Sequence, residues 1–454
     1  MKKIFFFLIC SALVCYGCTQ KQSHSGENTL SDVEKILGLS ICWAEAKYNF
    51  VYFDRITFDW DSLYKATIPL VLATKNYFEY YRELIRFVAR LQDGHTYVWW
   101  DEDRQDYWNN WAHIPVSTRL IDGKMIVTGV HCIELEQVEG VKIGIEVVKI
   151  NGIDVHEYVS TYVKPYIFSS TEQYLNFIAY GMNAMRGKIT EPVRLTFKDE
   201  NNRVFESNIN RILSDEPDFL SDILLLYSES KIFDFSVLEN NIGMLKINGF
   251  WQENFTSYFD AIYEKILDTD ALIIDIRGNP GGNSNNSEYI LSHLTNENFQ
   301  MSAWSSRRYV PALTSWNRRL REWHIGEPWI GQPIKDKPFY SKPVAVLIDE
   351  STFSAAEDFC VGFRNMNRGL IIGAPSGGST GNPIWFRLPG GGTVSFCSKK
   401  DTYPDGTEFV GVGILPDIEA RESVSSFLSK AKTGIDNSNA ARKAIEILKS
   451  AIEK

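Results

Sequence analysis

The chain has 454 residues, 44% of them hydrophobic and 13% aromatic, a composition typical of globular proteins and long enough for two or three domains. Its formal net charge is −10, and no long run of Lys or Arg occurs. Because phosphate binding needs a basic face, we expect no nucleic-acid partner.

The N-terminal residues are typical of an export signal. Two lysines precede an apolar stretch at residues 4–14, which is too short to span a bilayer. The stretch ends in VCYGC, which resembles a bacterial lipobox in placing Gly17 before Cys18, although a Cys stands where that motif usually has Leu. We therefore expect residues 1–18 to be a lipoprotein signal peptide, Cys18 to be lipidated, and residues 19–30 to form a polar tether. A plain secretory signal or an uncleaved anchor is the alternative.

Four cysteines follow this leader, namely Cys42, Cys132, Cys360 and Cys397. Their spacing matches no metal-binding motif, and each lies in a strongly apolar stretch. We interpret them as buried thiols and expect no metal.

Residues 31–111 are predicted to form a helical domain. Apolar residues recur at spacings of three and four in LSDVEKILGLSICWAEAKYNF and in NYFEYYRELIRFVARL. The aromatic stretch between these helices, residues 52–74, is expected to pack them together. The second helix runs into LQDGHT, where His95 opens the following loop or strand.

Residues 112–212 are predicted to form a small, mostly β module with one or two helices. IPVSTRLIDGKMIVTGV alternates as a hairpin does, and VKIGIEVVKINGIDVHEYV contains a strand, a tight Asn151-Gly152 turn and a helix start. A further hairpin turns at Asn201-Asn202.

Residues 213–454 are predicted to form an α/β core with a mixed sheet and a C-terminal helix. From about residue 240, the apolar strands NIGMLKINGF, ALIIDIR, KPVAVLID and GLIIG alternate with helical segments. Residues 283–342 form a Trp- and Arg-rich insertion that is a candidate substrate wall, although we expect its Trp-rich segment 304–329 to serve domain packing and not a ligand site. Lys399 and Lys400 follow the last strand pattern, and we expect both to face solvent.

The stretch STFSAAED allows two interpretations of Ser354. Ser354 and Glu357 have the spacing of a helix-capping box, which needs no chemistry. The same Ser also lies between a buried strand and a helix, where the Ala355 N–H is unpaired and the helix dipole is positive. A serine in this place can be both the cap and a nucleophile.

Acyl transfer also needs two N–H donors for the oxyanion and a base. The loop RGNPGGN follows a buried strand, so Gly281 or Gly282 is a candidate donor beside Ala355. His95 in the loop DGHT is the candidate base, although a lone histidine is more often structural.

Four motifs in this order, LIIDIRGNPGG, STFSAAED, GLIIGAPSGGSTG and TYPDGTEFVGVGILPD, resemble the C-terminal-processing (tail-specific) serine peptidase family. The front half with LQDGHT resembles the helical domain of the branch related to the tricorn core protease, and residues 112–212 resemble a degenerate PDZ domain. The resemblance implies an α/β (α+β multidomain) fold with a helical domain, a PDZ-like module and a mixed-sheet protease core. The four motifs are specific together, but each alone is not.

The resemblance implies that Ser354 is the nucleophile and that the oxyanion donors are Ala355 and the Gly281-Gly282 loop. In the processing-peptidase branch the base is a lysine, whose position falls on Ser379, and the loop here contains no lysine. In the tricorn-like branch the base is a histidine, which matches His95.

The sequence does not identify the residue that orients this histidine. In the tricorn-like branch a serine precedes the histidine, whereas here the preceding residue is a glycine. The family's glutamate falls by spacing on Val410, with Glu408 two residues earlier. Asp93, Thr96 and Glu408 are the candidates.

We therefore expect an exported, membrane-tethered serine endopeptidase of a bacterial cell envelope, acting on protein or peptide substrates without a cofactor. It would touch the membrane only through its N-terminal lipid, and its PDZ-like module would recognise substrate C-termini by strand addition. The alternative hypothesis is a catalytically weak peptide- or ligand-binding protein on the same scaffold, because the loop lacks its lysine. An esterase would use the same groups. The oligomeric state and the natural substrate do not follow from the sequence.

Overall fold

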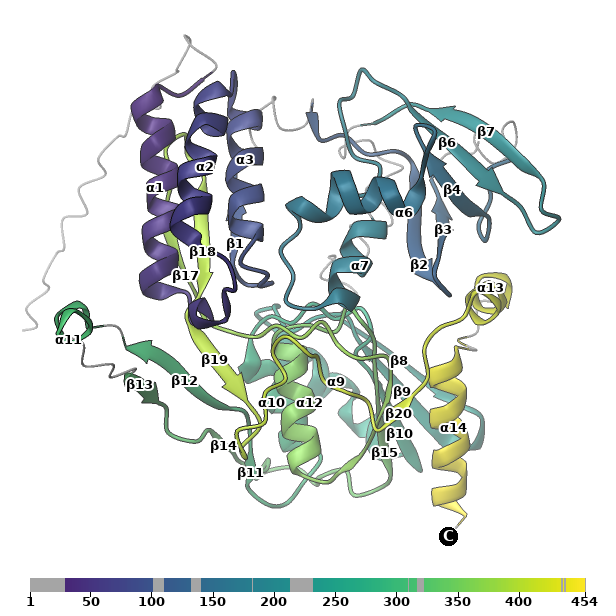
Figure 1. The fold of residues 1–454 in the computed structure, drawn as a ribbon. Coiled ribbons are helices and arrows are strands. Elements are labelled where there is room, and N and C mark those ends of the chain that lie inside the picture. Colours follow the sequence, from purple (N-terminus) through teal and green to yellow (C-terminus); the bar gives the residue numbers. More distant parts are fainter. Residues whose placement is uncertain are drawn as a thin grey trace, which may run out of the picture.

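The computed structural model describes residues 29–100, 110–131, 140–181, 183–212, 232–308, 310–316, 322–433, 436 and 438–453. The predicted signal peptide, Cys18 and Cys132 lie outside these residues. Figure 1 shows a helical layer, a small β-rich body and a larger α/β body, which confirms the predicted multidomain combination of helices and sheets.

The helical layer consists of α1 (Asp32–Asn49), α2 (Trp60–Ala73) and α3 (Tyr77–Ala89), with the 3₁₀ turn η1 (Phe53–Arg55) between the first two. Each helix has a side-chain N-cap, from Ser31, Asp59 and Asn76 respectively. Helix α2 lies in the stretch that we expected only to pack two helices together, so three helices replace the two predicted. The Asp59 carboxylate, which accepts two backbone N–H groups, was its start signal.

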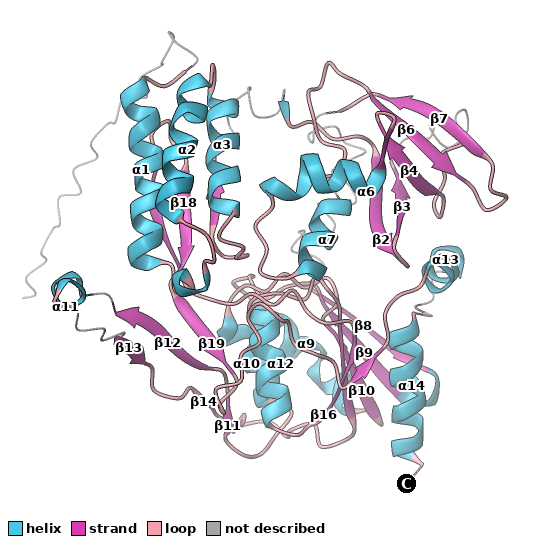
Figure 2. Cartoon of the chain, in the orientation of Figure 1, coloured by secondary structure: helices cyan, strands magenta, loops and turns pink. Residues whose placement is uncertain are grey.

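A hairpin from the C-terminal part of the chain completes this layer. Strands β17 (Pro383–Arg387) and β18 (Thr393–Cys397) pair antiparallel, and β18 also pairs with β1 (Tyr97–Trp99). Figure 2 shows this hairpin against the helices of the layer, and α1 contacts β18. The helical layer is therefore built from both halves of the chain.

The β-rich module has the strand order β2-β3-β4-β6-β7, with β5 paired to β4, and all of its pairs are antiparallel. Its elements are β2 (Val116–Ile121), β3 (Lys124–Val130), β4 (Glu146–Ile150), β5 (Ile153–Asp154), β6 (Val193–Lys198), β7 (Val204–Ile209), α6 (Val155–Tyr158), the π-helical turn η2 (Val159–Val163), the 3₁₀ turn η3 (Lys164–Tyr166) and α7 (Glu172–Tyr180). Asn151 and Gly152 both have positive φ, as the predicted tight turn requires.

The core sheet has the order β20-β16-β15-β10-β9-β8, parallel except for β8 against β9. Its strands are β8 (Phe233–Leu238), β9 (Ile242–Ile247), β10 (Ala271–Asp275), β15 (Val344–Ile348), β16 (Gly369–Gly373) and β20 (Ile418–Glu419), and η5 (Glu239–Asn241) joins the first two. Leu272 and Ile274 belong to one apolar cluster and Ala271 and Ile273 to another, because successive side chains face opposite sides of the sheet.

Helices cover both faces of this sheet. One face packs against α9 (Phe255–Leu267), α10 (Ser284–Ser292) and α12 (Ala355–Asn365), and the other against α14 (Asn439–Ile452), which follows α13 (Val424–Thr433). The predicted strands and helices of the core are confirmed. A sheet with both faces covered leaves its carboxyl edge as the place for a site.

The insertion at residues 283–342 has regular structure and begins with helix α10 of the core. It contains β12 (Ala303–Arg308) and β13 (Glu322–Ile325), which form a three-stranded sheet with β19 (Lys399–Thr402). It also contains α11 (Pro311–Ser315) and a small pair of β11 (Phe299–Gln300) with β14 (Ile330–Gly331).

Candidate active site

Ser354 lies where β15 gives way to α12, at the carboxyl edge of the core sheet. Its φ of 57° and ψ of −124° fall in a region that residues with side chains rarely adopt. A strained strand-to-helix turn of this kind holds a nucleophile clear of the chain. The Ser354 N–H also donates to Glu357 Oε2 at 3.2 Å, so the carboxylate half of the predicted capping box is present.

His95 is brought to Ser354 by the pairing of β1 with β18. Tyr97 stands opposite Ser395, and the Ser395 hydroxyl donates to the His95 carbonyl at 2.9 Å. The imidazole lies flat on Phe353, with ring centroids 4.9 Å apart. Its Nε2 is 3.1 Å from Ser354 Oγ, although the two residues are 259 positions apart in the chain. The two predicted residues therefore meet in hydrogen-bonding geometry.

The other ring nitrogen of His95, Nδ1, lies 2.9 Å from Ser379 Oγ. If Nε2 accepts the Ser354 proton, Nδ1 carries the ring hydrogen and donates it to the Ser379 oxygen. Ser379 stands where the resemblance placed a missing lysine. Nothing in the sequence marked it as the partner of His95, because a serine in a Gly- and Ser-rich loop is ordinary.

The candidate orienting residues Asp93 and Thr96 contact the main chain instead of the His95 ring. Asp93 Oδ1 accepts the backbone N–H of His95 at 3.0 Å, and Thr96 Oγ1 accepts the backbone N–H of Cys397 at 3.0 Å. Both side chains are buried. They fix the path of the chain on either side of His95.

The third candidate, Glu408, is held by ion pairs with Arg55 and Lys400. Lys399 pairs with Asp401, at 3.0 Å between Nζ and Oδ1. The side chains of the two lysines are only 22% and 24% exposed, so our interpretation of them as solvent-facing is wrong.

Glu357 joins the nucleophile to the loop that carries Ser379. Its fully buried carboxyl group accepts hydrogen bonds from the Ser354, Gly378 and Ser379 N–H groups and from the Ser376 hydroxyl. Burial raises the pKa of this carboxyl group to about 8, although all four donors favour the charged form. One side chain thus sets the position of both serines that flank His95.

The glycine loop after β10 lies directly against the nucleophile. A Cβ on Gly281 would fall 2.7 Å from Ser354 Cβ and 2.8 Å from the Ala355 nitrogen. The N–H of Gly281 donates to Asn279 Oδ1 at 2.9 Å. Of the two glycines proposed from sequence, Gly282 is therefore the better oxyanion donor, together with Ala355.

The electrostatic environment of His95 favours its neutral form. Burial, followed by the positive charge of Lys399, lowers its pKa to about 4. Part of the ring surface stays accessible. A neutral imidazole at physiological pH is the form that a general base requires.

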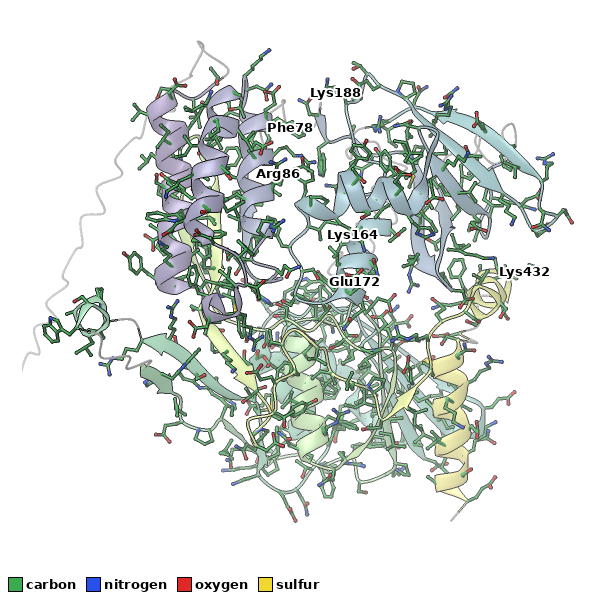
Figure 3. The ribbon with its side chains drawn as sticks, in the orientation of Figure 1. Phe78, Arg86, Lys164, Glu172, Lys188 and Lys432 are labelled. Carbon is green, nitrogen blue, oxygen red and sulfur yellow. The ribbon has the colours of Figure 1, made fainter. Side chains whose placement is uncertain are left out.

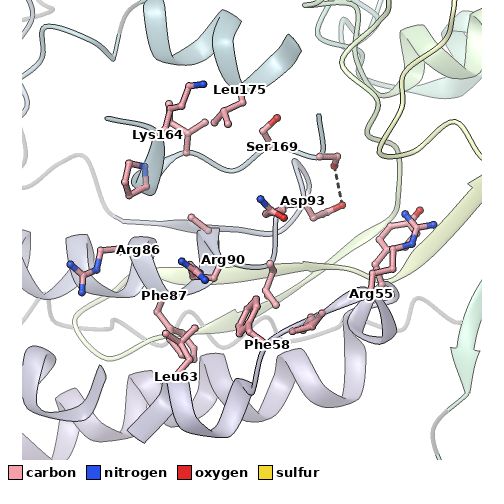
Figure 4. A pocket seen from close by; sticks show the side chains of 18 of the residues that line it. Arg55, Phe58, Leu63, Arg86, Phe87, Arg90, Asp93, Lys164, Ser169 and Leu175 are labelled. Carbon is pink, nitrogen blue, oxygen red and sulfur yellow. Dashed lines mark hydrogen bonds between the residues drawn. The ribbon is translucent and has the colours of Figure 1, made fainter. Parts of the chain in front are cut away.

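Two cavities lie near these residues. One of about 850 Å³ is lined by α2, α3, the segment before α7 and Val410, and it reaches Asp93 (Figure 4). Figure 3 places its cationic residues Arg86 on α3 and Lys164 ahead of α7. Neither Ser354 nor His95 lines it. A second cavity, of about 620 Å³, is lined by Gly282 and Asp358, and Ser354 and His95 do not line it either.

Within the described residues, no group of three or more His, Cys, Asp or Glu side chains is arranged to hold a metal ion. Cys42, Cys360 and Cys397 are free and buried, as predicted. Over the same part of the chain, no helix combines the length and apolarity that crossing a bilayer needs.

Comparison with known proteins places residues 241–420 in the family model described as peptidase family S41. A carboxy-terminal-processing protease of Bartonella bacilliformis is 25% identical over 244 residues, which are 52% of this chain and 49% of that protein. A CtpA-like serine protease of Staphylococcus aureus is 21% identical over 40% of this chain and 33% of its own length. The chain thus spans about half the length, or less, of these curated relatives.

The solved structure of mature CPAF complexed with lactacystin superposes with a TM-score of 0.70. It is 16% identical and covers 93% of this chain and 99% of the CPAF chain. At this identity the likeness concerns the fold alone, and it extends beyond the core to nearly the whole chain.

Proposed function

We propose that the chain is a C-terminal-processing peptidase of family S41, a serine endopeptidase that cleaves protein or peptide substrates through an acyl-enzyme at Ser354. The observation that carries the proposal is the 3.1 Å approach of His95 Nε2 to Ser354 Oγ. A strained serine at a helix N-terminus, paired with a neutral imidazole, is suited to nucleophilic catalysis.

In the proposed reaction, Ser354 Oγ attacks the carbonyl carbon of the scissile bond while His95 Nε2 takes its proton. The N–H groups of Gly282 and Ala355 hold the oxyanion that develops. The C–N bond then breaks as His95 returns the proton to the leaving amine, and a water molecule activated by the same base releases the acyl group.

We assign Ser379 as the positioning residue for His95, in a role that a carboxylate fills in many serine hydrolases. A hydroxyl fixes the imidazole tautomer but stabilises the imidazolium less than a charged group does. Ser379→Ala should lower kcat by roughly tenfold, the worth of one hydrogen bond. It should also move the acid limb of the pH profile, which a purely structural role would leave in place.

The experiment that tests the proposal compares the wild type with Ser354→Ala on a peptide library. Loss of the cap costs about 1 kcal/mol, so the variant should fold and be inactive. Ser287→Ala is a matched control, because this buried serine in α10 donates to the Ser284 carbonyl of its own helix. Full activity in Ser354→Ala would contradict the assignment. Peptide binding without turnover in the wild type would favour the binding-protein alternative.

We further propose that the leader directs the protein to a bacterial cell envelope, where a lipid on Cys18 tethers it. The pattern of residues 1–18 and the bacterial origin of the relatives support this placement. Metabolic labelling with a fatty-acid analogue should mark the wild type and not Cys18→Ala. Equal labelling of both would contradict the tether.

We retain residues 31–111, 112–212 and 213–454 as the proposed division into domains, with residues 112–212 as a PDZ-like module that binds substrate C-termini. The edge strands of its antiparallel sheet support strand addition. Deletion of the module should impair cleavage of long, C-terminally tagged substrates more than cleavage of short peptides. Unchanged cleavage of both classes would contradict this role.

A further inference from the structure

One face of the β12–β19 pair turns toward the cavity of about 620 Å³. Alternate side chains of each strand line it, namely Trp304 and Ser306 from β12 and Lys399 and Asp401 from β19. Trp304 stands directly opposite Asp401 in the strand register. Since residues two apart share a face, this set is a consequence of the strand pairing.

The cavity adjoins the reacting groups. Its wall includes Gly282, the proposed oxyanion donor, and Asp358, one turn into the helix that Ser354 begins. Lys399 in the same wall is close enough to lower the pKa of His95. The cavity therefore borders the place where the carbonyl of a bound substrate would meet the Gly282 N–H.

The wall is acidic. Glu288, Asp358 and Asp401 face one cation, Lys399. Asp401 is 1% exposed, and burial raises the pKa of its carboxyl group to about 6. Lys399 Nζ lies 3.0 Å from Oδ1, which leaves Oδ2 without a cationic partner among the described residues. A buried carboxylate in this state is costly until a donor reaches it.

The rest of the wall suits an alkyl chain. Met301, Trp304 and Trp329 line it, and the Trp329 indole N–H is fixed by Glu288 Oε2 at 2.7 Å. Indole faces attract cations as well as methylene groups. Among the described residues, the Asp358 carboxylate accepts the hydroxyls of Ser284 and Ser302, so it keeps lone pairs for a further donor.

We propose that this cavity is a substrate subsite that selects a lysine or arginine side chain near the cleaved bond. The inference rests on the proposed peptidase function and adds its substrate class. The aliphatic stem lies against Met301 and Trp304, and the cationic head reaches the partly exposed Asp358, with the buried Asp401 adding negative charge behind the wall. An acidic side chain is repelled by these carboxylates, and an apolar one brings no cation to them.

The test uses Ser354→Ala, which binds without turnover, and peptides that differ at one position as lysine, norleucine or glutamate. This position is scanned along the peptide, and dissociation constants are measured. A charged hydrogen bond in this setting makes the lysine peptide bind at least roughly tenfold more tightly than the norleucine peptide.

Adding Asp401→Asn or Asp358→Asn should remove most of this preference, whereas Lys399→Met should increase it by freeing Asp401. Asp405→Asn, in the exposed turn at residues 403–406, is the control and should change nothing. Circular dichroism and thermal melts identify any variant that misfolds. The Lys399→Met arm keeps the test decisive if a carboxylate variant fails to fold.

Equal binding of the lysine and norleucine peptides at every position, or a preference that survives both carboxylate variants, overturns the subsite. If the wild type still cleaves norleucine peptides in that case, the peptidase function is retained and only the subsite is rejected. Conversely, a lysine preference in binding without cleavage of any peptide by the wild type overturns the peptidase and retains the cavity as a site for cationic side chains.

Discussion

Ser354, His95 and Ser379 form a chain of two hydrogen bonds, and no carboxylate among the described residues hydrogen-bonds to the imidazole. The carboxyl groups near His95 act on the backbone instead, Asp93 on its N–H and Glu357 on the loops that carry the two serines. The two hydrogen-bond partners of the His95 ring are neutral hydroxyls, so burial and the charge of Lys399 determine the pKa of His95.

We predict that kcat/KM of the wild type rises with pH below the ordinary histidine value of about 6.5. The base must be neutral, and burial with Lys399 lowers the pKa of His95 to about 4, so the rise should lie near that value. Lys399→Met removes a positive charge and should move the rise to higher pH. A wild-type limb at or above 6.5, or a shift to lower pH in the variant, would contradict this environment.

At the scale of elements, the loop after β10 and the turn before α12 are packed backbone to backbone. A Cβ on Gly281 would lie 2.6 Å from the Phe353 carbonyl oxygen, and both segments are main chain that cannot swing aside. We predict that Gly281→Ala abolishes turnover. Gly278→Ala is the matched control, because Gly278 also has positive φ but nothing lies within 4 Å of its Cβ position.

Both variants place a residue with a side chain at a positive φ. The backbone strain from this conformation is similar in the two and amounts to roughly 1 kcal/mol. Gly281→Ala should lose more stability than Gly278→Ala, because only its Cβ meets main chain, and only Gly281→Ala should lose activity, as measured by urea unfolding and peptide assays. Equal activity in the two variants would show that the close approach does not matter.

Glu357, at the start of α12, makes a prediction about stability. The folded chain holds its proton up to about pH 8, whereas the unfolded chain releases it near the ordinary value of roughly 4.3. The free energy of unfolding should therefore fall as pH rises through this window, by about 1.4 kcal/mol per pH unit from this group, and level off above it. Glu357→Gln cannot titrate and should lack this component.

Urea unfolding of the wild type and of Glu357→Gln across this pH window isolates the contribution of Glu357 to the free energy of unfolding. Parallel curves would mean that the four hydrogen-bond donors keep Glu357 charged in the fold, in conflict with the dominance of burial.

The sequence predicted the core elements well, because buried parallel strands are long apolar runs and their helices are amphipathic. Helix α2 was missed because its face is broken by Pro69 and by aromatic residues. Ser354 and His95 were proposed from motifs, and the structure brings them together. The contact of Ser379 with His95 was not foreseen, because it depends on the β1–β18 pairing that brings distant segments together, and pairing over such separations leaves no local pattern.

At the scale of the whole molecule, the apolar clusters differ from the predicted domains. One continuous cluster joins the helical layer, including Leu84 and Phe87, to core residues such as Ile274 and Phe359. The β-rich module has a separate cluster. Its described links to the core include the ion pairs of Arg119 with Glu350 and Glu422.

We predict that the β-rich module opens separately from the rest of the molecule. In native-state hydrogen exchange with low denaturant, the amides of β3, β4 and β6 should exchange through a partial opening of lower free energy. The amides of α1 and α3 should exchange together with those of β10 and β15, because they share one core. If the amides of α1 and α3 exchange through an opening of lower free energy than the amides of β10 and β15, this coupling is contradicted.

The central claim, that Ser354 is a nucleophile activated by His95, is tested most directly by labelling with a fluorophosphonate probe and mapping the adduct by mass spectrometry. We predict that the wild type and Lys400→Ala are labelled at Ser354 at similar rates, because Lys400 pairs with Glu408 on the far face of β19. His95→Ala should be labelled more slowly by a factor on the order of 10²–10⁴, the usual worth of a general base. Rapid labelling of Ser354 in His95→Ala, or its loss in a folded Lys400→Ala protein, would contradict the account.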